Sequence, residues 1–192
     1  IYKTFHLCYT KEKAYFLCYT ERRMFMHSVS LVPADTPALL ADTARLAGEI
    51  WREYFPGIIS PEQVEYMVDK FQSLPAMEEQ IRSQGYTYYQ IRCGEEVLGY
   101  TGVCPEADGL FLSKLYLKKE YRGEGYATKA FRELTALCRE KGYRSIRLTC
   151  NKGNTHSLEV YRHWGFVQTD AVKTDIGGGF VMDDYVMTYN LD

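Results

Sequence analysis

One short segment constrains the fold of this chain more than any other. Leu115–Ala130 has the pattern of a strand, a glycine-marked turn and an amphipathic helix in immediate succession. The turn, Arg122–Ala127, contains Gly123 and Gly125, which let the backbone approach a ligand closely because glycine has no side chain. Such a turn leaves backbone N–H groups unpaired at a helix N-terminus, where the helix dipole adds partial positive charge. The segment therefore predicts a site for an anion, and phosphate is the natural guest.

The remaining chain alternates between helical and strand periodicity, which predicts a mixed α/β fold with a mostly antiparallel central sheet flanked by helices. The predicted helices begin at the caps Thr36 and Ser60, cover Met77–Ser83, run from Ala127 to a stop at Gly142, and run from the cap Asn154 to Gly165. The predicted strands are Ser28–Val32, Tyr86–Cys93, Val97–Cys104, Leu110–Leu117, Ser145–Cys150, Phe166–Thr174 and Phe180–Tyr189.

Length and composition narrow the class of protein. A chain of 192 residues with 46% apolar side chains can bury one good core, and no apolar run approaches the roughly 20 residues of a membrane span. The six cysteines are scattered and include no C-x-x-C pair, which argues against a zinc site and a disulfide framework. We expect a cytoplasmic protein without a metal. The net charge of −2 gives no general attraction to nucleic acid, and nothing indicates a membrane partner.

Charge is nevertheless unevenly distributed along the chain. Residues 34–85 contain nine acidic and four basic side chains, whereas residues 114–147 contain ten basic and four acidic ones. Solvated helix surfaces would produce either imbalance. Taken together, the two segments suggest a basic pocket for a polyanion beside an acidic region that attracts a cation.

The first 25 residues differ from the rest. Leu7–Lys13 is echoed ten residues later by Leu17–Arg23, and the chain begins with Ile1, whereas Met26 stands just before the first predicted strand. We expect residues 1–25 to be an upstream extension outside the native domain, and residues 26–192 to be that domain. The alternative is an added hairpin or an arm that packs on a partner.

Two motifs together resemble one family. Arg122–Ala127 fits the pattern Q/R-x-x-G-x-G/A, and Asn154–Phe166 supplies an asparagine, a helix, a tyrosine and a Gly-Phe pair in the expected order. This pairing is similar to the GCN5-related N-acetyltransferases, the GNAT superfamily, and the resemblance covers roughly residues 26–192. It implies a GNAT fold and an acyltransferase that moves an acetyl group directly from acetyl-CoA to a primary amine.

The resemblance also implies which residues bind the donor. Backbone N–H groups from Gly123 to Thr128 would hold the pyrophosphate of coenzyme A, and Arg122 would add a guanidinium charge. The strand before the turn would pair with the pantetheine arm, and Asn154 would reach that arm or act only as a helix cap. The implied cofactor-binding set is Leu115, Tyr116, Leu117, Arg122, Gly123, Glu124, Gly125, Tyr126, Ala127, Thr128 and Asn154.

Tyr161 is the residue that we expect to carry chemistry, because transfer from a thioester expels a thiolate that a phenol can protonate. The amine must also lose a proton, since with a pKa of about 10.4 only about one part in a thousand is neutral at pH 7. The strand Leu110–Leu117 offers no carboxylate for this purpose. The general base is therefore left unassigned among a water chain and the four surface carboxylates Asp108, Glu95, Glu96 and Glu120.

The sequence indicates the acceptor only weakly. Trp51, Tyr54, Phe55 and Tyr66 lie among acidic residues in the helical segment, which favours a cationic amine such as a polyamine. A protein N-terminus, a lysine, an amino sugar or an antibiotic remain open, as does another acyl group. The alternative function is a sensor or scaffold that binds acyl-CoA without turnover. A homodimer through sheet edges or terminal strands would be ordinary for this fold.

Overall fold

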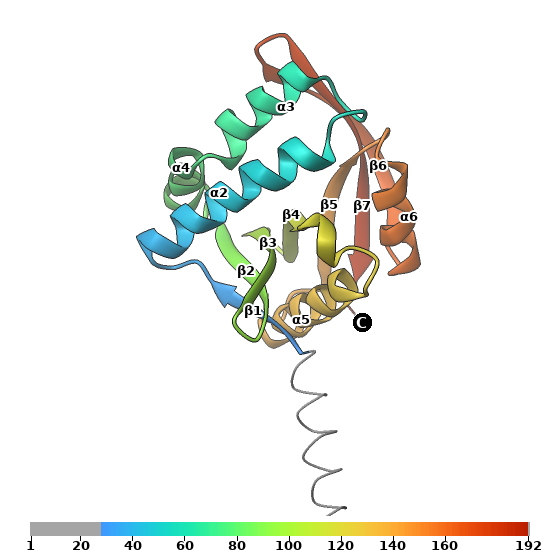
Figure 1. Ribbon diagram of the computed structural model, residues 1–192. Coiled ribbons are helices and arrows are strands. Elements are labelled where there is room, and N and C mark those ends of the chain that lie inside the picture. Colours follow the sequence, from blue (N-terminus) through green and yellow to red (C-terminus); the bar gives the residue numbers. More distant parts are fainter. Residues whose placement is uncertain (1–27, 192) are drawn as a thin grey trace, which may run out of the picture.

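The computed structural model describes residues 28–191, which form a sheet flanked by helices (Figure 1). The hypothesis about residues 1–25 concerns residues outside this range and stays a prediction. The strands are β1 (Val29–Pro33), β2 (Thr87–Cys93), β3 (Glu96–Pro105), β4 (Gly109–Leu117), β5 (Ser145–Asn151), β6 (Val167–Gly177) and β7 (Phe180–Asn190). The helices are α2 (Pro37–Tyr54), α3 (Pro61–Met67), α4 (Leu74–Gln84), α5 (Tyr126–Glu140) and α6 (Thr155–His163), with the short turns η1 (Val68–Gln72) and η2 (Lys119–Tyr121).

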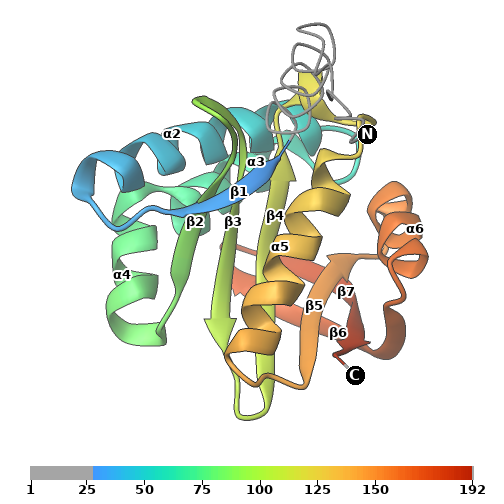
Figure 2. The ribbon, with the colours of Figure 1, turned by 90° about the horizontal axis from the view of Figure 1, so that it is seen from below.

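These seven strands form one sheet in the order β1-β2-β3-β4-β5-β7-β6. Every neighbouring pair is antiparallel except β4 and β5, which are parallel. Helices α2 and α4 pack on one face through a cluster around Tyr88 and Tyr100, and α5 packs on the other through Phe131 and Leu134 (Figure 2). The predicted mixed α/β fold with a mostly antiparallel sheet is confirmed.

The sheet opens between its two parallel strands. β4 and β5 pair only from Gly109 opposite Ser145 to Phe111 opposite Arg147. A register shift between β3 and β4 follows at once and leaves Ser113 as an extra residue in β4. Beyond this bulge, side chains of both β4 and β5 line a shared cavity. The separation of the two strands is therefore what makes room for a site in the middle of the sheet.

The helices on the α2 face begin where the sequence predicts. Thr36 Oγ1 accepts a hydrogen bond from the N–H of Leu39 at 3.2 Å, and Ser60 Oγ accepts one from the N–H of Gln63, also at 3.2 Å. A proline stands in the first turn of both helices. Its fixed φ suits that position and it has no N–H to leave unpaired.

The helical segment after Ser60 differs in detail from the prediction. The predicted second helix changes at Val68 into a five-residue π-helical turn, η1, and α4 begins at Leu74 rather than at Met77. Pro75 explains the earlier start, because its φ is already helical. The wider turn directs Gln72 inward, where its buried amide oxygen accepts a hydrogen bond from the hydroxyl of Tyr100 at 3.1 Å.

Candidate active site

The predicted anion-binding turn lies between β4 and α5. Gly123 and Gly125 have φ of +80° and +77°, a backbone conformation that L side chains rarely adopt, and Gly125 occupies the cap position of α5. The N–H groups of residues 123–128 donate to no acceptor within residues 28–191. A Cβ at either glycine would meet no protein atom within 4 Å. The amides therefore surround open space at a helix N-terminus, and this arrangement fits a phosphate group.

Arg122 connects this turn to helix α2. Its Nη2 donates to Glu53 Oε2 at 2.5 Å, its Nε donates to the carbonyl of Leu117 at 3.0 Å, and its guanidinium lies 4.8 Å from the ring centre of Tyr54. Because the carboxylate of Glu53 partly neutralises the guanidinium of Arg122, Arg122 adds less positive potential to the turn than an unpaired arginine would. The helix dipole and the backbone amides supply most of it.

A cavity of about 300 Å³ adjoins the turn, and we call it the donor cavity. The predicted site residues that line it are Leu115, Tyr116, Leu117, Arg122, Gly123, Gly125, Ala127, Thr128 and Tyr161. Glu124 and Tyr126 do not line it with their side chains. Tyr126 instead packs edge-on against Tyr121, with ring centres 6.1 Å apart, so only the backbone of Tyr126 is placed to contribute.

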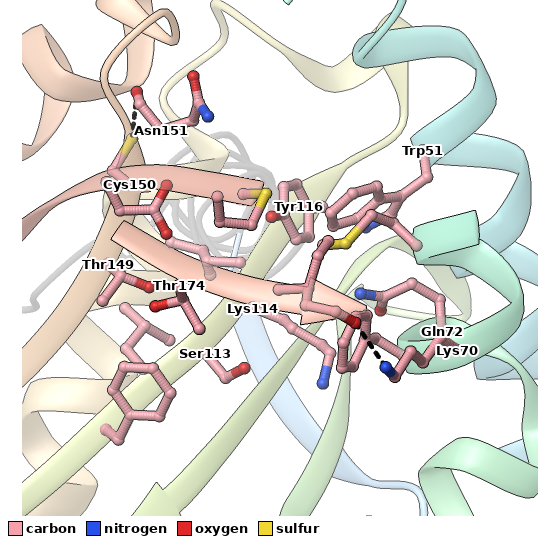
Figure 3. A pocket seen from close by; sticks show the side chains of 18 of the residues that line it. Trp51, Lys70, Gln72, Ser113, Lys114, Tyr116, Thr149, Cys150, Asn151 and Thr174 are labelled. Atoms are coloured by element: carbon pink, nitrogen blue, oxygen red, sulfur yellow. Dashed lines mark hydrogen bonds between the residues drawn. The ribbon is translucent and has the colours of Figure 1, made fainter. Parts of the chain in front are cut away.

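A second, larger cavity of about 580 Å³ lies in the opening of the sheet, and we call it the sheet cavity. Its walls come from β4, β5, β6 and β7 and from the helical segment between Trp51 and Gln84. Cys150 and Asn151 lie at one end and Lys70 and Gln72 at the other (Figure 3). Leu115, Tyr116, Ser157 and Tyr161 line both cavities, so the two meet at these residues.

Tyr161 thus lies at the junction of the two cavities. Its ring packs against Trp164 and Phe166, with centres 5.7 Å and 5.6 Å away, so its position is fixed by aromatic contacts. Its hydroxyl has no hydrogen-bond partner within the described part of the chain. Burial, and then the proximity of Cys150 and Tyr54, raise the pKa of this phenol well above 10. The hydroxyl therefore keeps its proton at neutral pH.

Asn154 acts as the cap predicted from the sequence. Its side-chain oxygen accepts from the N–H of Ser157 at 3.3 Å and from the hydroxyl of Tyr54 at 2.9 Å. These bonds join α6 to α2 beside the junction of the cavities. Asn154 is buried and lines the sheet cavity rather than the donor cavity. A contact with the pantetheine arm remains a prediction.

Two buried charged residues of the sheet cavity could not be recognised from the sequence. The first, Lys114, is 5% exposed, and its Nζ donates to Gln80 Oε1 at 2.8 Å and to the hydroxyl of Tyr88 at 2.6 Å. The rings of Tyr86 and Tyr88 lie 4.7 Å and 4.9 Å from this nitrogen. Burial lowers its pKa to about 7. The available signal was a lysine inside a mostly apolar strand.

The second missed residue is Asp184 of β7, which is 8% exposed and lines the same cavity. The signal was the pair Asp183-Asp184 inside an apolar strand. By contrast, Glu95, Glu96, Asp108 and Glu120, the four carboxylates considered from the sequence, line neither cavity. Glu96 accepts from the hydroxyl of Tyr121 at 2.8 Å on the surface.

A family comparison decides the class of this protein. The model of the acetyltransferase (GNAT) family matches residues 45–166, which are more than half of the chain and include the turn, Asn154 and Tyr161. The chain belongs to the GNAT family. The resemblance identified from the two motifs is therefore confirmed, and with it the prediction of an acetyl-CoA-dependent acyltransferase.

Curated relatives of this GNAT protein are distant. A spermidine N(1)-acetyltransferase of Thermoplasma acidophilum is 26% identical over 142 residues, which are 72% of this chain and 86% of the relative. A Bacillus subtilis protein, provisionally named a [ribosomal protein bS18]-alanine N-acetyltransferase, is 28% identical over 78 residues. The match covers 41% of this chain and 52% of that relative, so the chain spans about half of its length.

Solved structures agree on the fold of this GNAT protein. The PaiA N-acetyltransferase of Thermoplasma acidophilum in complex with coenzyme A superposes with a TM-score of 0.70 at 23% identity, covering 85% of this chain and 99% of that one. A GCN5-related N-acetyltransferase from Rhodopseudomonas palustris gives 0.69 at 17% identity, covering 86% and 98%. In residues 28–191 we find no helix long and apolar enough to cross a membrane, and no cluster of side chains arranged to hold a metal ion.

Proposed function

We propose that this protein transfers an acetyl group from acetyl-CoA to the primary amine of a small cationic acceptor, within a complex that holds both substrates. One observation carries the proposal: two cavities meet at Tyr161, one beside the phosphate-binding turn and the other within the sheet. Substrates bound in the two cavities would both lie beside Tyr161, and direct transfer requires them to lie close together.

Two features of the donor cavity fit coenzyme A. The free N–H groups of residues 123–128 would bind the pyrophosphate, and no side chain obstructs the space above Gly123 and Gly125. Leu115–Leu117 lies past the last residue of β4 that pairs with β5, so this edge of the strand is available to the amide groups of the pantetheine arm. The turn, this strand edge and Tyr161 all line the same cavity.

The carboxylates that support a cationic acceptor are not the ones that the sequence suggested. The acidic residues near Trp51 face outward in ion pairs: Glu49 with Arg45, Glu53 with Arg122 and Glu65 with Arg52. The carboxylates that line the sheet cavity are instead Glu79 and Asp184, and the aromatic walls come from Trp51 and Phe55 among others. Such a lining fits an organic ammonium ion. The spermidine N(1)-acetyltransferase of Thermoplasma acidophilum supports a polyamine as one candidate.

The test is consumption of acetyl-CoA, screened over spermidine, simple alkylamines, amino sugars and lysine-containing peptides. We expect turnover on small amines and the release of free coenzyme A in equal amount to the acetylated product. Binding of acetyl-CoA without turnover on any of these acceptors would contradict the proposal and favour the acyl-CoA sensor. Turnover on peptides alone would contradict the small acceptor.

The donor assignment makes a separate prediction about the turn. Replacement Gly125→Ala should weaken acetyl-CoA binding by about ten-fold, because a Cβ enters the space above the amides and disfavours φ of +77°. Gly142→Ala is the matched control, since Gly142 ends the same helix with φ of +74° and equally open surroundings. Both variants should lose about 1 kcal/mol of stability. Titration calorimetry should show weaker acetyl-CoA binding for Gly125→Ala alone, and equal binding by both variants would contradict the assignment.

A further inference from the structure

We propose that Asp184 is the residue that binds the ammonium group of the acceptor in the sheet cavity and removes its proton. This inference rests on the proposed function and names the missing base of the reaction. It places the ammonium-binding group on β7, outside both motifs of the family.

The first support is a carboxylate oxygen that is buried without a partner. Asp184 is 8% exposed, and its Oδ1 has no hydrogen-bond partner in residues 28–191. Its neighbour Asp183 points to the other side of the sheet, where it forms ion pairs with Lys152 and Lys173. A buried carboxylate without a cation is costly. Asp184 therefore lacks in this fold the partner that its neighbour has, and a cationic ligand in the cavity would supply it.

The second support is the position of Asp184 relative to the reaction centre. It pairs across the sheet with Asn151, the last residue of β5, and the chain continues from there into the cap of α6. Thr149, Cys150 and Asn151 form the β5 wall of the cavity (Figure 3). Tyr161, on α6, lines the same cavity. An acceptor held at this wall by Asp184 thus shares a space with the hydroxyl at the junction of the two cavities.

The surroundings of Asp184 give its carboxyl a pKa that suits a general base near neutral pH. Burial, and then the nearby charge of Asp183, raise its pKa to about 6, while Lys152 acts in the opposite direction. Cys150 lies near this carboxylate, and its thiol is neutral because burial raises its pKa. The other charged groups that line the cavity are Lys70, Glu79 and Lys114. Asp184 is therefore mostly ionised at pH 7 and above, and is a better base than an ordinary carboxylate.

In the proposed reaction the amine nitrogen loses two protons. The acceptor arrives as R–NH₃⁺ and gives one proton to Asp184, which passes it to solvent. The lone pair thus freed forms the N–C bond, and the C–S bond breaks with its electron pair on sulfur. Tyr161 protonates that sulfur and is reprotonated by the second proton of the nitrogen. The net change is an amide, a thiol and one proton released.

The main test is Asp184→Asn, which keeps the shape of the side chain and removes its charge. We expect kcat/KM for the amine to fall by about 100-fold while acetyl-CoA binding is unchanged. In the wild type, kcat/KM should fall below a pH of about 6, and this acidic limb should be absent from the variant. A purely structural aspartate would not produce this limb. The melting temperature of the variant should stay level or rise, because an unpaired buried charge is removed.

Two control variants test whether activity depends on the charge of Asp184 itself. Asp183→Asn removes the neighbouring carboxylate that faces the other side of the sheet, and should leave kcat/KM within about three-fold of the wild type. Asp184→Glu restores the charge and should recover part of the lost activity. If the wild type is active and Asp184→Asn keeps its kcat/KM and its acidic limb, the assignment of Asp184 is wrong while the acetyltransferase function stands.

A binding measurement keeps the inference testable if no amine in the screen is acetylated, which would contradict the proposed function instead. In a carbon-13 NMR titration, the signal lost in Asp184→Asn identifies the carboxyl carbon. We expect butylammonium chloride to lower the apparent pKa of this carboxyl, and butanol to leave it unchanged. An equal response to both probes, or to neither, would overturn an ammonium site at Asp184.

Discussion

Replacement of Tyr161 by phenylalanine should lower kcat by about 100-fold to 1,000-fold, within the range that general acid catalysis contributes. The hydroxyl donates to no other described group, so its removal breaks no hydrogen bond within residues 28–191. The ring keeps its contacts with Trp164 and Phe166, so packing should be preserved. Stopped-flow measurement of coenzyme A release at saturating substrates should show the loss, with the affinity for acetyl-CoA unchanged.

Two further tyrosines sharpen this test. Tyr189→Phe is the control, because Tyr189 belongs to the same aromatic cluster, with its ring centre 5.5 Å from Phe166, but lines neither cavity. It should retain wild-type turnover. Tyr116 lines both cavities and lies close to Tyr161 and Cys150. If Tyr161→Phe turned over at the wild-type rate while Tyr116→Phe did not, the proton donor would be Tyr116 and our assignment would be wrong.

Much of the fold follows from local sequence signals. Thr36 and Ser60 cap the helices that they predict, and Gly125 begins α5 in the left-handed conformation that glycine permits. The arrangement of the strands was not predictable in the same way. β7 lies between β5 and β6, and β4 pairs with β5 over only three residues. Periodicity states which face of a strand is buried, but not which strand lies beside it.

The residues of the candidate site also differ in how far they could be predicted from local sequence. The turn and Tyr161 could be recognised because each belongs to a contiguous motif whose geometry is set by neighbouring residues. Lys114 and Asp184 could not, since the role of each depends on distant parts of the chain: Gln80 and Tyr88 for the lysine, β5 and α6 for the aspartate. The four carboxylates considered from the sequence as a base line neither cavity. The acidic residues counted between residues 34 and 85 were also a poor guide to the acceptor side, because Glu49, Glu53 and Glu65 face outward in ion pairs.

Lys114→Met should stabilise the protein, and the gain should depend on pH. A pKa lowered from 10.5 to about 7 by burial corresponds to about 5 kcal/mol in favour of the neutral amine. The Met variant loses the hydrogen bonds that Lys114 makes to Gln80 and Tyr88, but the hydroxyl of Tyr88 still donates to Gln80 Oε1 at 2.6 Å. We therefore expect a net gain of about 2–3 kcal/mol at pH 6, measured by urea denaturation.

The sign of the pH dependence follows from proton binding. Between pH 7 and 10.5 the unfolded lysine holds a proton that the folded one has lost, so the stability of the wild type rises with pH in this window. Below pH 7 both states are protonated and the cost of the buried charge is constant. The advantage of Lys114→Met should thus be greatest below pH 7 and decline toward pH 10.5. Lys173→Met is the control, because Lys173 is an exposed strand lysine with a side chain 72% accessible, and it should change stability by less than about 0.5 kcal/mol. If Lys114→Met is instead less stable than the wild type at pH 6, the network with Gln80 and Tyr88 stabilises the fold more than the buried charge destabilises it.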